Sequence, residues 1–222
     1  MENSLTLAED IVLILLDDSS GRLANIDLMT LNYSMAGAVL MELALRNKID
    51  TDLDRLVVVD SKTTGIQMLD HYLNIISTEI NDTNNNTKYW LTEFSTYGDE
   101  ILNAALDMLV DKNILKMEEK KILWVFGTRR YPMVDHTQEK EVKRRIVDLL
   151  MSDEIPTPKD VVLVCLIDTC SLFTTILSEK EVQHLKPRIQ KIKKLDLIGQ
   201  AVTQVLEKLR SDIAEAMLML PH

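Results

Sequence analysis

Residues Leu31 to Ile49 read LNYSMAGAVLMELALRNKI. Between Tyr33 and Leu45 nearly every position is apolar, and a helix that is apolar on all faces belongs in the interior of a protein. The basic turn Arg46-Asn47-Lys48 follows, and Ile49 begins an extended segment. This stretch therefore predicts a central buried helix with the rest of the chain packed around it.

The composition is typical of one globular domain. The chain has 222 residues, of which 46% are apolar and 27% are charged, and a chain of this size can bury a single large core. The apolar runs Ile11 to Leu16 and Val161 to Ile167 are much shorter than the roughly 20 residues that cross a bilayer. The first residues, MENSLTLAED, lack the basic and apolar parts of a signal peptide. We expect a single domain over residues 1–222, cytoplasmic or peripheral to a membrane.

The net charge of −10 is unevenly distributed. Residues 1–110 carry 6 Lys and Arg against 18 Asp and Glu, whereas residues 111–222 carry 19 against 17. An anionic partner is therefore expected to meet the C-terminal half, and the acidic first half argues against a nucleic acid as partner. One stretch of the second half contains cations and no acid, which a solvated helix face also explains: Lys186, Arg188, Lys191, Lys193 and Lys194.

The sequence contains no motif for catalysis, a cofactor or a metal. Neither GxGxxG, GxxxxGK[ST] nor GxSxG occurs, and the four histidines lack the spacing of metal ligands. Cys165 and Cys170 lie five residues apart in an apolar stretch, so buried free thiols are favoured. Asp168 and Ser171 in the same stretch are interpreted as a buried hydrogen-bonded pair. We expect no enzyme, no cofactor and no metal site.

Local patterns predict a mainly helical chain. Thr6 and Glu9 form a capping-box pattern that opens the first helix, and residues 81–87, NDTNNNT, predict an exposed loop. The β-branched run in 54–62 and the apolar run 122–126 predict strands. Apolar periodicity predicts helices over 7–16, 33–46, 66–76, 97–112, 139–151, 158–177 and 195–220.

Several segments resemble the Golgi phosphoprotein 3 family in their order and spacing. Their joint order extends over nearly the whole chain and is closest to the short members typical of bacteria. The segments are Leu5 to Asp10, Asp18 to Leu23, Gly37 to Arg46, Thr64-Gly65 with Leu69-Asp70, Leu109 to Leu115, and Arg130-Tyr131-Pro132 with Asp135 and Glu139.

The resemblance implies a mainly α, single-domain fold. In that fold a buried four-helix core is surrounded by amphipathic helices and accompanied by a β-hairpin, which here would run from Ile122 to Pro132. In eukaryotic relatives the hairpin contributes to oligomerisation, and the protein docks on membranes through phosphatidylinositol 4-phosphate. A homo-oligomer formed through this hairpin is therefore expected.

The family's phosphate-binding residues have no counterpart here. Its lipid pocket uses a Trp and an Arg near the central helix and two basic residues on the helix that matches 97–112. An ungapped alignment places Asp27, Ala36, Asp99 and Leu102 at those positions. A phosphomonoester needs several charged donors, so we expect this pocket not to bind the lipid in the family's manner.

Two classes of function remain. The first is a non-enzymatic protein that binds anionic membrane lipid through another basic surface, for which Arg129 and Arg130 beside Trp124 and Tyr131 are the candidates. The alternative for these residues is a core Trp124 and arginines that pair with acids. The second class is a soluble interaction or regulatory module with a protein partner and no lipid ligand. A winged-helix nucleic-acid binder is less favoured.

Overall fold

The computed structural model describes residues 4–17, 20–51, 55–119 and 129–195, together with residues 200 and 204. The described chain is mostly helical, with two short antiparallel sheets. Its elements are α1 Leu7–Leu15, α2 Leu28–Leu45, β1 Ile49–Thr51, β2 Leu56–Val58, α3 Gln67–Glu79, α4 Thr87–Ser95, α5 Gly98–Asp111, β3 Glu118–Glu119, β4 Arg129–Arg130, α6 Thr137–Met151, α7 Pro158–Thr169, the 3-10 helix η1 Leu172–Thr175, and α8 Glu179–Lys193.

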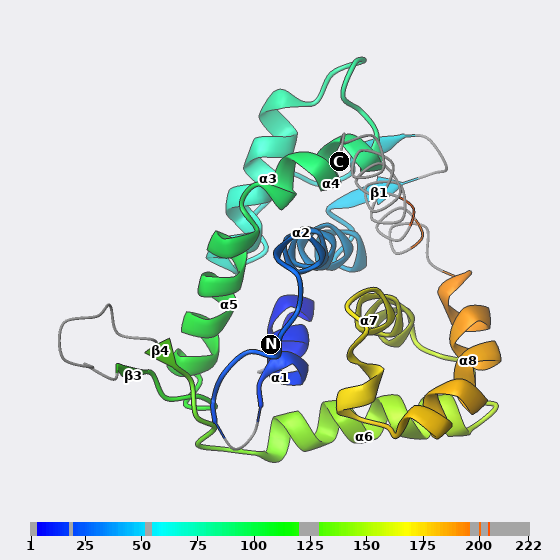
Figure 1. Ribbon diagram of the computed structural model, residues 1–222. Coiled ribbons are helices and arrows are strands. Elements are labelled where there is room, and N and C mark those ends of the chain that lie inside the picture. The colour runs from blue at the N-terminus through cyan, green and yellow to red at the C-terminus, as the bar shows by residue number, and fades with distance from the viewer. Residues whose placement is uncertain are drawn as a thin grey trace, which may run out of the picture.

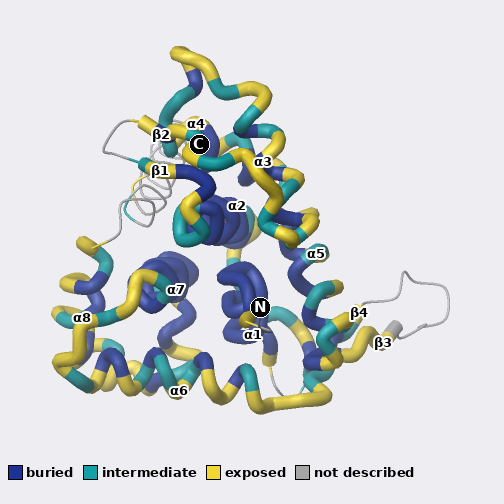
Figure 2. The backbone as a smooth tube through the Cα atoms, turned by 180° about the vertical axis from the view of Figure 1, so that it is seen from behind, coloured by how far each residue is buried: buried dark blue, intermediate teal, exposed yellow. Residues whose placement is uncertain are grey.

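Four helices form the centre of the molecule, as expected. Helices α1, α2, α5 and α7 pack against one another, and α3, α4, α6 and α8 surround them (Figure 1). Figure 2 shows that α1, α2 and α7 are buried along most of their length, whereas the outer helices are exposed on one side. The mainly α fold with a buried four-helix core is therefore confirmed.

Helix α2 owes its apolar sequence to this position. It is the one described helix that is long and apolar enough to cross a membrane, with a mean hydropathy of 1.3 over 18 residues. However, 72% of that window is buried inside the protein. The side chains of Met35, Ala36, Val39 and Leu40 have no exposed area, so packing against the surrounding helices explains the composition.

Side-chain caps fix where the core helices begin. The predicted capping box is confirmed at α1, where Thr6 Oγ1 accepts from the Glu9 amide and Glu9 accepts from the Thr6 amide at 2.8 Å. A second capping box, Thr157 with Asp160, opens α7. Asp27 caps α2 by accepting from the Thr30 amide at 2.8 Å. These bonds satisfy amides that a helix leaves without a partner at its N-terminus.

Buried ion pairs attach α1 to its neighbours. Glu9 has no exposed area and accepts from Lys112 Nζ at 2.7 Å, which links α1 to the end of α5. Asp10 pairs with Lys159 at 2.8 Å and links α1 to α7. Burial raises the pKa of Asp10 above its ordinary value, while the Lys159 charge opposes that shift. These acids of the first half are therefore structural.

The hairpin has different bounds from the prediction. Glu118 pairs with Arg130 and Glu119 with Arg129, and a further bridge joins Leu115 to Met133. The described arms thus reach from 115 to 133, beyond the predicted Ile122 to Pro132. The predicted strand 122–126 lies outside the described residues, as does most of the predicted helix 195–220. The extended segment after the central helix is confirmed as β1 and β2.

Three local predictions differ from the structure. The helix predicted over 158–177 ends at Thr169 because Ser171 adopts a left-handed conformation with φ of 57°. The Ser171 amide donates to Asp168 O at 3.0 Å, but Ser171 is exposed and the Asp168 carboxylate pairs with Lys193, so the two are hydrogen-bonded but are not a buried pair. Helix α4 was not predicted, and one residue of the predicted exposed loop, Asn84, is buried. Both cysteines are buried thiols that form no disulfide, as predicted.

Candidate functional site

The four positions that the ungapped alignment places at the family's lipid pocket lie at the N-cap of α2 and in the first halves of α2 and α5. The backbones of these two helices approach closely at Gly98. A side chain could not fit there, because a Cβ at this position would lie 2.5 Å from Asn32 Cα. Ala36 has no exposed area and Leu102 is also buried. Asp27 is used as the cap of α2, and Asp99 is exposed in the first turn of α5. Two of the four positions are thus core positions.

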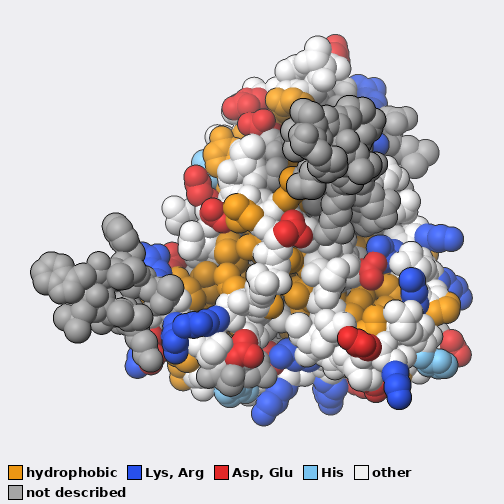
Figure 3. Space-filling view, viewed as in Figure 1, with side chains coloured by type: hydrophobic (Ala, Val, Ile, Leu, Met, Phe, Trp, Pro, Cys, Tyr) orange, Lys and Arg blue, Asp and Glu red, His pale blue; other side chains and the backbone are white. Residues whose placement is uncertain are grey.

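The α2–α5 face contains no cation within the bounds of either helix. Neither Leu28–Leu45 nor Gly98–Asp111 contains a Lys or Arg, and α5 contains four acids. Figure 3 shows Asp and Glu side chains over the upper left of the molecule, near α3 and α5, and Lys and Arg along the lower and right edges, near α6 and α8. This arrangement repels an anionic head group from the α2–α5 face.

The predicted cationic residues stand at the base of the hairpin. Arg129 is exposed and Arg130 is half-buried, and both belong to β4. Tyr131 is buried, with 7% of its surface exposed, because its amide donates to Gly21 O at 2.8 Å and holds it against the turn after α1. Trp124 lies outside the described residues. The structure therefore places the two arginines next to each other, whereas Tyr131 is buried.

Sequence reasoning missed two exposed apolar side chains at the same place. Met117 and Val134, which flank the two arms, are 46% and 61% exposed. Lys116 lies beside Met117 and makes a 3.6 Å pair with Glu118, in which both side chains are largely exposed. Met117 and Val134 are isolated apolar residues outside any periodic pattern, so the sequence did not indicate that they are exposed. Together with the arginines they belong to the hairpin-base surface: Lys116, Met117, Arg129, Arg130 and Val134. Glu118 lies opposite Arg130 and Glu119 opposite Arg129 in the ladder, so this surface also contains acids, as the alternative interpretation of the arginines expects.

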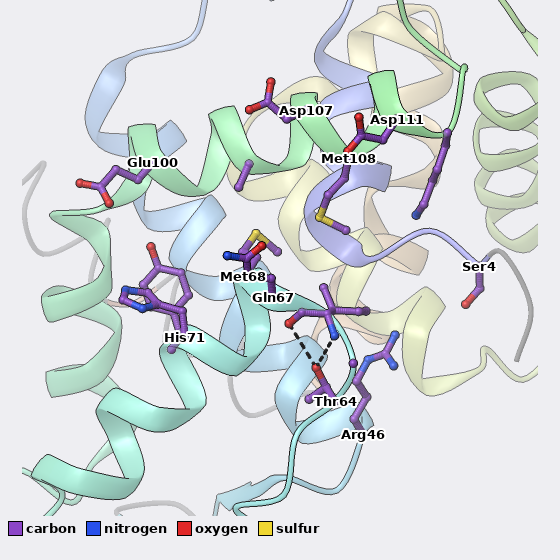
Figure 4. A pocket seen from close by; sticks show the side chains of 15 residues that line it. Ser4, Arg46, Thr64, Gln67, Met68, His71, Glu100, Asp107, Met108 and Asp111 are labelled. Atoms are coloured by element: carbon purple, nitrogen blue, oxygen red, sulfur yellow. Dashed lines mark hydrogen bonds between the residues drawn. The ribbon is translucent and has the colours of Figure 1, made fainter.

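A groove of about 1050 Å³ opens elsewhere, between α3 and α5 (Figure 4). Met68 and Met108 form part of its lining, and three acids of α5 follow one another along its wall: Glu100, Asp107 and Asp111. Residues seven and eleven positions apart lie on the same side of a helix. All three carboxylates are exposed, and no ion pair within the described residues neutralises them.

The cations of this groove are engaged by buried acids. Arg46 Nε pairs with Glu42 at 2.8 Å, and Lys112 Nζ pairs with Glu9. Burial and the nearby Glu100 raise the pKa of Tyr72 to about 12, so this residue is a neutral phenol at physiological pH. In the described part of the chain no group of three or more His, Cys, Asp or Glu could hold a metal ion. The groove thus offers carboxylates and thioethers.

The sequence matches the family model described as Golgi phosphoprotein 3 (GPP34) over residues 7–209. This chain therefore belongs to the Golgi phosphoprotein 3 family. It is 30% identical over 170 residues to "Vacuolar protein sorting-associated protein 74" of Schizosaccharomyces pombe, covering 67% of this chain and 49% of the relative. It is 29% identical over 168 residues to the protein of the same name from Eremothecium gossypii, covering 68% of this chain and 50% of the relative.

The chain spans about half the length of these curated relatives. Both relatives are fungal, so they do not confirm the expectation of a short bacterial-type member, which stays a prediction. The family itself was identified correctly from the order of its segments.

Proposed function

We propose that this chain is a non-enzymatic, cytoplasmic protein that binds peripherally to anionic membranes through its hairpin-base surface. The observation that carries the proposal is that three cations, Lys116, Arg129 and Arg130, lie at the same end of the hairpin as the exposed Met117 and Val134, where they outnumber the two acids of β3. Arginines next to an exposed Met and Val suit the boundary between lipid head groups and acyl chains.

The sequence of the segment that joins the two arms supports the same proposal. Residues 120–128 read KKILWVFGT, so a Lys pair precedes the apolar run and the pair Arg129-Arg130 follows it. Trp124 is the aromatic residue of this run, and Trp is enriched at membrane interfaces. The relatives' name refers to protein sorting, which is consistent with work at a membrane surface.

Vesicle flotation tests this function. We expect the protein to float with vesicles of phosphatidylcholine and phosphatidylserine and to stay behind with phosphatidylcholine alone. Each cation near an anionic surface contributes about 1 kcal/mol, so Arg129→Glu with Arg130→Glu is expected to lower binding more than about tenfold.

A matched control uses exposed cations on another face. Lys186→Glu with Lys191→Glu changes the net charge equally but lies on α8. Equal losses for the two double variants would show that net charge, not the hairpin-base surface, determines binding. Absence of binding at physiological salt would reject the membrane function.

A second function, the binding of a cationic protein segment, is favoured by the acids along the α3–α5 groove. An amphipathic helix with Lys or Arg on one face would place its apolar side chains on Met68 and Met108 and its cations beside the three α5 acids. Binding of a labelled Leu- and Lys-repeat peptide can be measured by anisotropy. Neutralising Glu100, Asp107 and Asp111 should weaken it about tenfold or more.

The control for the groove removes three acids elsewhere in the acidic half. Glu79→Gln, Asp82→Asn and Glu93→Gln keep the groove acids and give the same net charge. If this control weakens peptide binding as much as the groove variant does, the groove is not the site.

A further inference from the structure

A second groove, separate from both surfaces, lies between the end of α2 and the start of α7. It has a volume of about 360 Å³, and all the described residues that line it are apolar: Met41, Ala44, Leu45, Pro156, Pro158, Val161, Val162 and Leu195. Next to Pro156, Ile155 is 93% exposed, and Leu195 on the groove wall is 63% exposed. An apolar hollow with exposed aliphatic side chains at its edge is the kind of surface that marks a docking site.

The chain itself leaves α8 at this groove. The end of α8 is held on α7, because Lys193 pairs with Asp168 and the Cys165 thiol donates to Lys193 O at 3.9 Å. Leu195, the last residue of the continuous described stretch, is part of the groove lining. Gln200 Nε2 donates to Lys194 O at 3.1 Å, so the chain is still close to this point five residues later. Residues 196–222 therefore start at the mouth of the groove.

The sequence of that segment supplies an apolar face of the right kind. Its apolar residues recur at intervals of three and four: Ile198, Val202, Val205, Leu209 and Ile213.

Two described residues give the orientation of that face. Gln200 and Gln204 are helical, and Gln204 is exposed. On a continuous helix with about 100° per residue, positions 198, 202 and 205 would lie on the side opposite these two glutamines. Because Gln204 is exposed, the apolar side of such a helix would be the one available to the groove.

We propose that residues 196–222 dock as an amphipathic helix, apolar face inward, in the groove formed by the end of α2 and the start of α7. The groove then takes a segment of its own chain, and neither a lipid nor a second copy is its occupant. Docking would cover the half-buried Ala44 and Leu45 and the exposed Leu195, and would add to the packing of the end of α2.

Hydrogen exchange of the full chain, followed by mass spectrometry, tests this docking. In the wild type the amides of 198–213 are expected to exchange at least about tenfold more slowly than those of an unstructured peptide. Val202→Asp with Val205→Asp should abolish that protection and speed exchange at Met41 to Leu45, while α1 and α5 stay protected. Gln200→Asp with Gln204→Asp, which adds the same charge to the opposite face, should change neither.

Ala44→Asp provides a second test from the groove side, because Ala44 is only half-buried and tolerates a variant better than the core. It should release 198–213 as the valine variant does. Unprotected 198–213 amides in the wild type, or equal effects of the valine and glutamine variants, would overturn the proposal. Protection that appears only at high protein concentration, or only with vesicles, would identify a second copy or a lipid as the occupant and would equally overturn it.

Discussion

The α2–α5 face and the hairpin base differ in charge and in burial. On the first, the positions that match the lipid-binding residues of the family are Asp27, Ala36, Asp99 and Leu102, and neither helix contains a cation. On the second, Arg129 and Arg130 stand beside exposed apolar side chains. The comparison teaches that this fold is compatible with an α2–α5 face whose two helices contain no cation. If this chain binds a membrane, the hairpin base is the better supported surface.

Substitution of Ala36 by arginine has the largest expected effect on this comparison. Ala36 is fully buried in α2, so Ala36→Arg introduces an unpaired charge and excess volume into the core. We expect a loss of stability of about 4 kcal/mol or more, or no soluble protein. Urea denaturation measures the loss, with Ala36→Ser as the mild control. A stable Ala36→Arg protein would show that this position opens to a pocket, and the contrast between the two surfaces would fail.

The next effect concerns the acids that the first half buries. Lys112→Met leaves Glu9 without its cation at a site with no exposed area, which is expected to cost about 3 kcal/mol. Adding Glu9→Gln should recover part of that loss in a double-mutant cycle. If the single variant is as stable as the wild type, the buried pair does not hold α1 on α5, and the acidity of the first half is less structural than we infer.

A smaller effect is expected at Asp70, which orders the approach to α3. Burial opposes the ionised form, but bonds from the Thr64 and Gly65 amides and the Thr64 hydroxyl keep the pKa of Asp70 below its ordinary value. Because the pKa of Asp70 is lower in the folded protein than in the unfolded chain, its carboxylate stabilises the fold at pH values above the unfolded pKa, near 3.8. This stabilisation is lost as the pH falls through the lower, folded pKa. Asp70→Asn should cost about 1 kcal/mol at pH 7.

Stability measured from pH 7 to pH 3 checks the sign. The difference between wild type and Asp70→Asn should shrink as the pH falls through and below 3.8. A difference that grows toward acid pH would contradict the assignment.

The smallest effect is expected from a cation placed on the exposed part of the α2–α5 face. Asp99→Lys converts the one exposed, non-capping position of the four. Since three further groups are still missing, we expect less than about threefold stronger binding to vesicles with phosphatidylinositol 4-phosphate. Asp82→Lys is the control for charge alone. A large and selective gain would mean that one added cation is enough to restore lipid binding at this pocket.

The parts of the fold that could be predicted are those encoded locally. The capping box at Thr6 and the apolar sequence of α2 each depend on neighbours within one or two turns. Helix α4 was missed although Asn86 caps it and Trp90 and Phe94 are fully buried four residues apart. This cap and these two aromatic residues are present in the sequence, but a helix of nine residues gives only a short apolar pattern.

Other features depend on contacts between distant segments, which local patterns do not contain. Tyr131 was expected on an interfacial surface, but its backbone bonds to Gly21, more than a hundred residues away in sequence. Lys193 pairs with Asp168 across two helices, and the acids of α5 line a groove only because residues of α3 line it too. The candidate arginines were found by composition, whereas the exposed Met117 and Val134 became visible only in three dimensions.

The most direct test of the central claim compares two anionic lipids at matched vesicle charge. The account predicts that flotation with phosphatidylserine equals flotation with phosphatidylinositol 4-phosphate, and that Arg129→Glu with Arg130→Glu lowers both. Strong selective binding to phosphatidylinositol 4-phosphate that survives this double variant would contradict it, because the α2–α5 face would then hold a phosphate without a cation of its own.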